Sequence, residues 1–125
     1  MLAMNTATGP STVLQGGQRM AQKLSEKQAK FSSMVGKLLG FVDTLPGYSV
    51  TLGDAYRDPR VTYGHKKSLH RQRLAIDLNL FIDGTYRTEG AAHLPLGLYW
   101  ESIGGSWGGR FDDANHYSLA HGGMK

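Results

Sequence analysis

Residues 74–81 limit the possible folds of this chain more than any other segment, because they alternate like a half-buried β-strand. Asp77 falls on one face of that strand beside the small Ala75, where a metal ion has room to approach. An unpaired buried carboxylate is costly, so Asp77 requires a metal ion, strong hydrogen bonds or an arginine partner such as Arg57 or Arg73. The opposite face carries only aliphatic side chains: Leu74, Ile76, Leu78 and Leu80.

A long amphipathic helix is expected before this strand. Ser25 and Gln28 form the pattern of a capping box, which predicts the helix start. Apolar residues then recur at three- and four-residue steps as far as Leu45, and Pro46-Gly47 predicts the helix end. This helix is expected to pack in the core rather than to carry chemistry.

The remaining elements are short. Strands are expected at residues 48–52, 85–87 and 116–119, and a second helix at about 94–103, with Pro95 in its first turn. Residues 106–111 are expected to form an aromatic, glycine-rich loop. This order of elements predicts an α+β fold, a small antiparallel sheet with flanking helices.

Length and composition indicate one domain without disulfide bonds. The chain has 125 residues, enough for a core of its own, and no cysteine, so any bound metal must be held by histidine and carboxylate side chains. Residues 1–22 lack periodicity and are expected to form a flexible arm before a domain at 23–125. Neither a secretory signal nor a membrane span is apparent, so synthesis in a cytoplasm is expected, with another exit route to any external substrate.

The charge pattern gives little support to nucleic-acid binding. The formal net charge is +4, and lysine and arginine are spread along the chain rather than clustered. An anionic polymer such as the bacterial cell wall fits this mild positive charge equally well.

Two histidines and two aspartates have the chemistry of an open zinc site. A catalytic zinc ion takes three protein ligands and keeps one position open for water. His70, Asp77 and His116 are the candidate ligands, and Asp113, three residues before His116, is the candidate base for the water. Arg57 is a candidate holder of the developing oxyanion, with a surface charge as its alternative.

Other residues near these motifs have simpler interpretations. The remaining histidines lack a partner pattern and are expected not to bind metal: His65, His93 and His121. Asp112 is interpreted as a solvated or structural charge, and Glu101 as a solvated charge. Trp107 and Tyr117 are candidate substrate-binding walls of a pocket, with ordinary core packing as the alternative.

At these residues the sequence resembles the LAS-type zinc peptidases, in the branch with VanY-like D-Ala-D-Ala carboxypeptidases and phage L-alanyl-D-glutamate endolysins. The resemblance spans about residues 25–120 and rests on S-x-H-x(6)-D followed by [DE]-x-x-H. The family often has glycine where this chain has Arg73, which leaves substrate choice open. The matching residues are Ser68, His70, Asp77, Asp113 and His116, with Ala75, Tyr56-Arg57 and Trp107-Gly108-Gly109 flanking them.

The resemblance implies the fold shared by hedgehog and D-Ala-D-Ala peptidase-like domains, with Zn2+ bound by the three ligands named above. It implies that Asp113 is the catalytic base, that Arg57 stabilises the polarised carbonyl, and that Ser68 supports the site or binds substrate. The implied protein is a monomeric phage endolysin that cuts the L-Ala–D-Glu bond of peptidoglycan stem peptides. It would stay in the host cytoplasm until a holin releases it to the wall.

Three alternatives stay open from the sequence. The same chemistry would serve a carboxypeptidase that removes terminal D-Ala. A related fold can also keep zinc and lose the reaction, although the presence of Asp113 argues against this. A basic structural or DNA-binding phage protein would bind DNA in a salt-sensitive manner, and chelators would have no effect on it.

Overall fold

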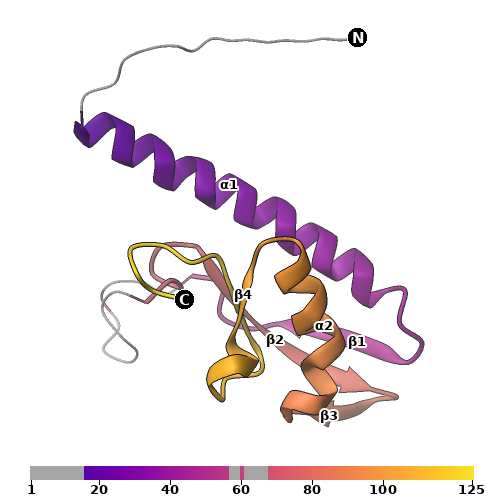
Figure 1. Cartoon of the computed structure of the whole chain (residues 1–125). Coiled ribbons are helices and arrows are strands. Elements are labelled where there is room, and N and C mark those ends of the chain that lie inside the picture. Colours follow the sequence, from indigo (N-terminus) through magenta and orange to yellow (C-terminus); the bar gives the residue numbers. More distant parts are fainter. Residues whose placement is uncertain (1–15, 57–59, 61–67) are drawn as a thin grey trace, which may run out of the picture.

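The computed structural model describes residues 16–56, 60 and 68–125 (Figure 1). These residues form an α+β fold, as the sequence predicts. None of the helices in these ranges is both long enough and apolar enough to cross a membrane. The elements in chain order are α1 (Gly16–Val42), β1 (Tyr48–Leu52), β2 (Ala75–Ile82), β3 (Thr85–Arg87), α2 (Gly90–Ser102), β4 (Ser106–Trp107), the 3-10 helix η1 (Gly108–Phe111) and β5 (His116–Ser118).

Strand β2 is the centre of an antiparallel sheet with the order β1-β2-β5-β4. One edge of β2 pairs with β1, from Tyr48 opposite Ile82 to Leu52 opposite Leu78. The other edge is shared, because β5 pairs with its first three residues and β3 pairs with its last three. The C-terminal part of the chain therefore lies beside the start of β2, where Asp77 is.

The core lies between the two helices and the aliphatic face of β2. Helix α1 runs across one side of the molecule, with α2 and the sheet beneath it (Figure 1). The alternation of β2 places its leucines and Ile76 in this core, which leaves Asp77 on the other face. The main helix and strand residues of the core are Phe31, Met34, Leu38, Val42, Ile76, Leu78, Leu80, Leu96, Trp100 and Tyr117.

Both predicted helices exist, but both begin earlier than expected. Helix α1 starts at Gly16, so Ser25 lies within it and the predicted capping box is wrong. Residues 18–23 are mostly good helix formers, which explains the extension. The predicted domain boundary after residue 22 falls inside α1. Residues 1–15 lie outside the described ranges, so the flexible arm stays a prediction.

Helix α2 starts at Gly90 rather than near Leu94, which places Pro95 inside the helix instead of in its first turn. Ala91 and Ala92 favour helix and extend it toward the N-terminus. The predicted loop at 106–111 is also only partly right. Ser106 and Trp107 form strand β4 against β5, because the Trp107 ring packs into the core and draws the backbone alongside Tyr117.

Candidate metal centre

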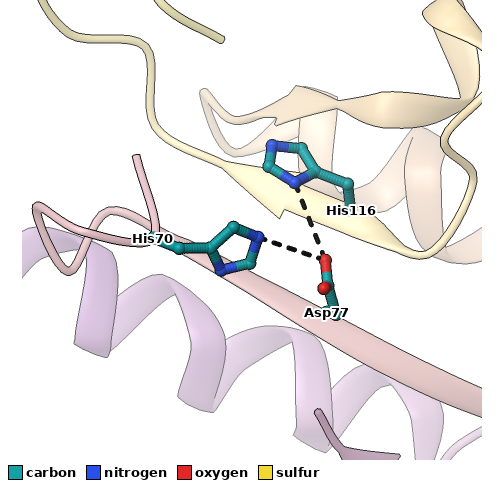
Figure 2. A group of neighbouring side chains, drawn as sticks. All are labelled: His70, Asp77 and His116. Carbon is teal, nitrogen blue, oxygen red and sulfur yellow. Dashed lines mark ion pairs between the residues drawn. The ribbon is translucent and has the colours of Figure 1, made fainter. Parts of the chain in front are cut away.

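Three segments bring two histidines to one carboxylate (Figure 2). His70 comes from the turn before β2, Asp77 from β2 and His116 from the first position of β5. His70 Nε2 lies 3.3 Å from Asp77 Oδ1, and His116 Nδ1 lies 3.7 Å from the same oxygen. Both histidines are buried and Asp77 is partly buried. The structure therefore brings together the three residues that the sequence predicts as ligands.

The register of β2 and β5 sets the contact between Asp77 and His116. The two residues are direct cross-strand partners, so their side chains project from the same face. The backbone of Asp77 bonds to the opposite edge, because its N–H donates to the Asp54 carbonyl and its carbonyl accepts from Gly53 N–H. Asp77 and His116 therefore form a non-hydrogen-bonded pair, the arrangement in which facing side chains lie closest.

A Schellman-type turn orients His70. Leu74 N–H donates to the Leu69 carbonyl at 2.8 Å, and Arg73 N–H donates to the His70 carbonyl at 3.3 Å. Arg73 has the left-handed conformation that closes such a turn, with φ of 58°. His70 N–H donates to Ser68 Oγ at 3.2 Å, so the Ser68 hydroxyl supports the same turn.

A second tight turn places Asp113 beside His116. His116 N–H donates to the Asp113 carbonyl at 3.0 Å, which closes a four-residue turn at the entry to β5. Asp113 Oδ2 lies 3.8 Å from His116 Nδ1, and its side chain is 52% exposed. Gly108 packs against this turn, and a β-carbon there would overlap the Asp113 carbonyl oxygen and lie 2.7 Å from His116 Cβ.

The electrostatics of the cluster keep Asp77 ionised. Burial raises the pKa of Asp77, but hydrogen bonds from His116 and His70 and the charges of both rings outweigh burial and lower the pKa to about 2. The far ring nitrogens, His70 Nδ1 and His116 Nε2, are buried and have no hydrogen-bond partner among the described residues. No described residue therefore fixes the tautomer of either ring through its far nitrogen, where a metal-bound imidazole carries its proton.

These residues fit a divalent metal ion. Two imidazole nitrogens and one carboxylate oxygen are the ligand types of open zinc sites. Tetrahedral zinc places neighbouring ligand atoms about 3.4 Å apart, given its usual bond lengths. The measured separations of 3.3 and 3.7 Å are close to that value, and all three ligand atoms lie within 4.8 Å of one another. The described residues therefore form a cluster that could hold a metal.

Comparison with known families agrees with this chemistry. Residues 62–119 match the family model of D-alanyl-D-alanine carboxypeptidases. The match supports the LAS-type peptidase family and implies a metallopeptidase. It covers slightly less than half of the chain and includes His70, Asp77, Asp113 and His116. No curated protein matches the chain.

A cavity of about 220 Å³ adjoins Asp113 on the side of β3. Within it His93 is 1% exposed, with Nδ1 2.8 Å from the Tyr117 hydroxyl. Burial lowers the pKa of His93 despite the opposing effects of the Arg87 carbonyl and Glu89. The cavity is a polar recess beside Asp113. Its lining is Leu78, Tyr86, Arg87, Thr88, His93, Asp112, Asp113, Ala114 and Asn115.

The sequence missed most of this cavity. Arg87 and Thr88 have no recognisable spacing relative to the candidate ligands, because they reach the site only through the pairing of β3 with β2. His93 lies outside the metal-capable cluster found in the described ranges, which consists of His70, Asp77 and His116. His121 is likewise outside that cluster and lies 3.2 Å from Lys27 Nζ.

The other candidate residues fall into two groups. Arg57 and His65 lie outside the described residues, so their predicted roles stay predictions. Ser68, Trp107 and Tyr117 are buried, which favours positioning and packing over direct contact with substrate. Trp107 donates its indole N–H to the Ala114 carbonyl at 2.7 Å, inside the turn that carries Asp113.

Two further charged residues, Glu101 and Asp112, have structural roles. Glu101 was expected to be a solvated charge, but both of its carboxylate oxygens bind Arg110, at 2.7 and 2.9 Å. Asp112 closes η1 in the left-handed conformation, with φ of 61°, which agrees with the structural role expected for it.

Proposed function

We propose that this protein is a zinc-dependent peptidase of bacterial peptidoglycan that hydrolyses an amide bond of the stem peptide. The observation that carries the proposal is the convergence of His70, Asp77 and His116, with the exposed Asp113 carboxylate 3.8 Å from His116 Nδ1. The family match over residues 62–119 supports the same reaction class and a cell-wall substrate.

The chain's residues have separate roles in this reaction. His70, Asp77 and His116 would hold a zinc ion, which supplies a Lewis acid that polarises the scissile carbonyl and acidifies water. Asp113 would accept the proton of the attacking water and deliver it to the leaving amine. Its exposed side chain is accessible for both transfers. Arg57 is proposed to stabilise the developing oxyanion, on the strength of the resemblance alone.

The cavity beside Asp113 is where the substrate would extend from the reacting bond. Its volume of about 220 Å³ suits one amino-acid side chain rather than a whole drug-sized ligand. Thr88 and Asn115 offer hydrogen-bonding groups there, and Tyr86 contributes an exposed aromatic wall. A polar peptide substrate suits such a recess.

The specific form of the proposal is a monomeric phage endolysin that cuts the L-Ala–D-Glu bond and stays in the host cytoplasm until release. The resemblance of the motifs to that branch supports it. A carboxypeptidase that removes terminal D-Ala uses the same chemistry and is the alternative. Mass spectrometry of digested wall fragments separates them: new D-Glu N-termini support the endopeptidase, and release of D-Ala alone excludes it.

The decisive experiment replaces Asp113. Asp113→Asn should leave zinc content unchanged in elemental analysis and abolish wall lysis, because the ligands remain and the proton acceptor is lost. Asp43→Asn is the matched control, since it removes an exposed carboxylate that belongs neither to the cluster nor to the cavity lining and should keep lysis. Lysis by Asp113→Asn at the wild-type rate would exclude the catalytic role of Asp113. Zinc uptake by a wild-type protein that never hydrolyses stem peptides would instead indicate a non-catalytic zinc domain.

A further inference from the structure

Arg73 occupies a backbone position that favours glycine. It closes the turn that carries His70, with φ of 58°, and its N–H donates to the His70 carbonyl. The C′ position of a Schellman turn is usually glycine, because a β-carbon is unfavourable in the left-handed conformation. Leu69 and Leu74, the first and last residues of this turn, are both apolar and buried. An arginine here therefore costs backbone stability that a glycine would not.

The Arg73 side chain stacks on Tyr56. Its guanidinium carbon lies 4.2 Å from the centroid of the Tyr56 ring, within the range of a cation–π contact. Both side chains are exposed, so burial does not force the contact. The side chains that lie near the Asp77 carboxylate are those of His70 and His116. Arg73 lies over Tyr56 instead, so it is not the arginine partner that the sequence allowed for Asp77.

This stack joins two segments that hold the candidate metal ligands. Tyr56 follows β1, where Gly53 N–H and the Asp54 carbonyl bind the backbone of Asp77. Arg73 lies three residues after His70 and is hydrogen-bonded to it. The Arg73–Tyr56 contact therefore ties the turn of His70 to the segment that lies against Asp77.

We propose that Arg73 is a positioning residue that acts through Tyr56 to hold His70 in register with Asp77 for metal binding. The inference rests on the metal site described under Proposed function. The left-handed backbone of Arg73 costs stability. In return, the stack of Arg73 on Tyr56 preorganises His70 and Asp77, which come from different segments. A preorganised ligand pair binds a metal ion more tightly than one that must be ordered on binding.

The test is a double-mutant cycle with zinc affinity and unfolding stability as readouts. Arg73→Gly should weaken zinc binding about two- to fivefold, the equivalent of one exposed cation–π contact, without lowering the stability of the zinc-free protein. Tyr56→Leu should weaken zinc binding to a similar extent. Adding Arg73→Gly to Tyr56→Leu should cause no further loss of affinity and should raise stability, since only the backbone strain remains to be relieved.

Tyr56→Phe is the matched control, because it keeps the aromatic face and should retain wild-type zinc affinity. The inference is overturned if Arg73→Gly binds zinc as tightly as the wild type, or if its loss of affinity persists undiminished in the Tyr56→Leu background. A wild-type protein that takes up no zinc defeats the proposed function and this inference with it. If the wild type binds zinc and Arg73→Gly binds it equally well, only the role of Arg73 is excluded and the proposed function stands.

Discussion

Asp77 and His116 face each other directly across β2 and β5, with His116 Nδ1 3.7 Å from Asp77 Oδ1, although 39 positions separate them in the chain (116 − 77). Because the contact follows from strand register, the sheet rather than a loop fixes two of the three residues of the candidate metal site. His70 completes the site from a turn whose geometry depends on Arg73. The two histidines are therefore held by different means, and substitutions should affect them differently.

Removal of the Asp77 carboxylate should abolish tight metal binding. Asp77→Asn keeps the shape of the side chain but replaces an ionised ligand, whose pKa is about 2, with a neutral amide. Zinc affinity, measured by competition with a chromophoric chelator, should fall by more than about 100-fold, because even residues that only support metal ligands are worth about 10- to 100-fold. Asn79→Ala is the control on the same face of β2, since the Asn79 side chain bonds to Thr51 and not to the cluster. Zinc affinity that survives Asp77→Asn unchanged would contradict the proposed ligand set.

Removal of the metal should lower both stability and activity. A ligand that binds only the folded state adds about 2.7 kcal/mol when its free concentration is 100 times its dissociation constant. Urea unfolding with excess zinc should therefore show a higher midpoint than unfolding with a chelator, and the chelated protein should not lyse cell walls. Readdition of zinc should restore both properties. Equal midpoints with and without zinc would show that the folded protein has no specific site.

The sequence indicated the three residues of the cluster because their signals lie in local patterns. Asp77 stands out as a carboxylate within an alternating strand, and the turn from Asp113 to His116 is set by a three-residue spacing. Strand β1 was predicted with its observed limits, because Tyr48–Leu52 combines β-prone residues with a clear Pro46-Gly47 break before it.

Other features could not be predicted because they depend on tertiary contacts. Strand β4 forms only because Trp107 packs beside Tyr117, and the cavity residues Arg87 and Thr88 reach Asp113 only through the pairing of β3 with β2. The unusual residue at Arg73 was visible in the sequence. Its left-handed backbone and its stack on Tyr56 were not, because neither leaves a periodic pattern.

Protonation of His93 should destabilise the protein in mild acid. Burial lowers the pKa of His93 in the folded protein below its ordinary value of 6.5, so the unfolded chain binds the proton more readily. The stabilising contribution of neutral His93 is therefore complete above about pH 6.5 and is lost as the pH falls below that value. Urea unfolding of the chelated protein between pH 5 and pH 8 should show this decline, and His93→Gln should reduce it. An unchanged slope in His93→Gln would exclude His93 as its source.

Gly108 should tolerate no side chain, because it supports the turn that links Asp113 to His116. A β-carbon at this position would overlap the Asp113 carbonyl oxygen and lie 2.7 Å from His116 Cβ, so the turn must move. Gly108→Ala should destabilise the protein by about 1–3 kcal/mol, the usual cost of overpacking, and should weaken both zinc binding and lysis as His116 and Asp113 shift together. Gly40→Ala provides the opposite control. Gly40 lies in α1, and a β-carbon there would have no atom within 4 Å apart from its own helix backbone. Alanine there should stabilise the helix by about 0.5–1 kcal/mol. A Gly108→Ala variant with wild-type stability and zinc affinity would show that the Asp113–His116 turn can move without disturbing the metal site.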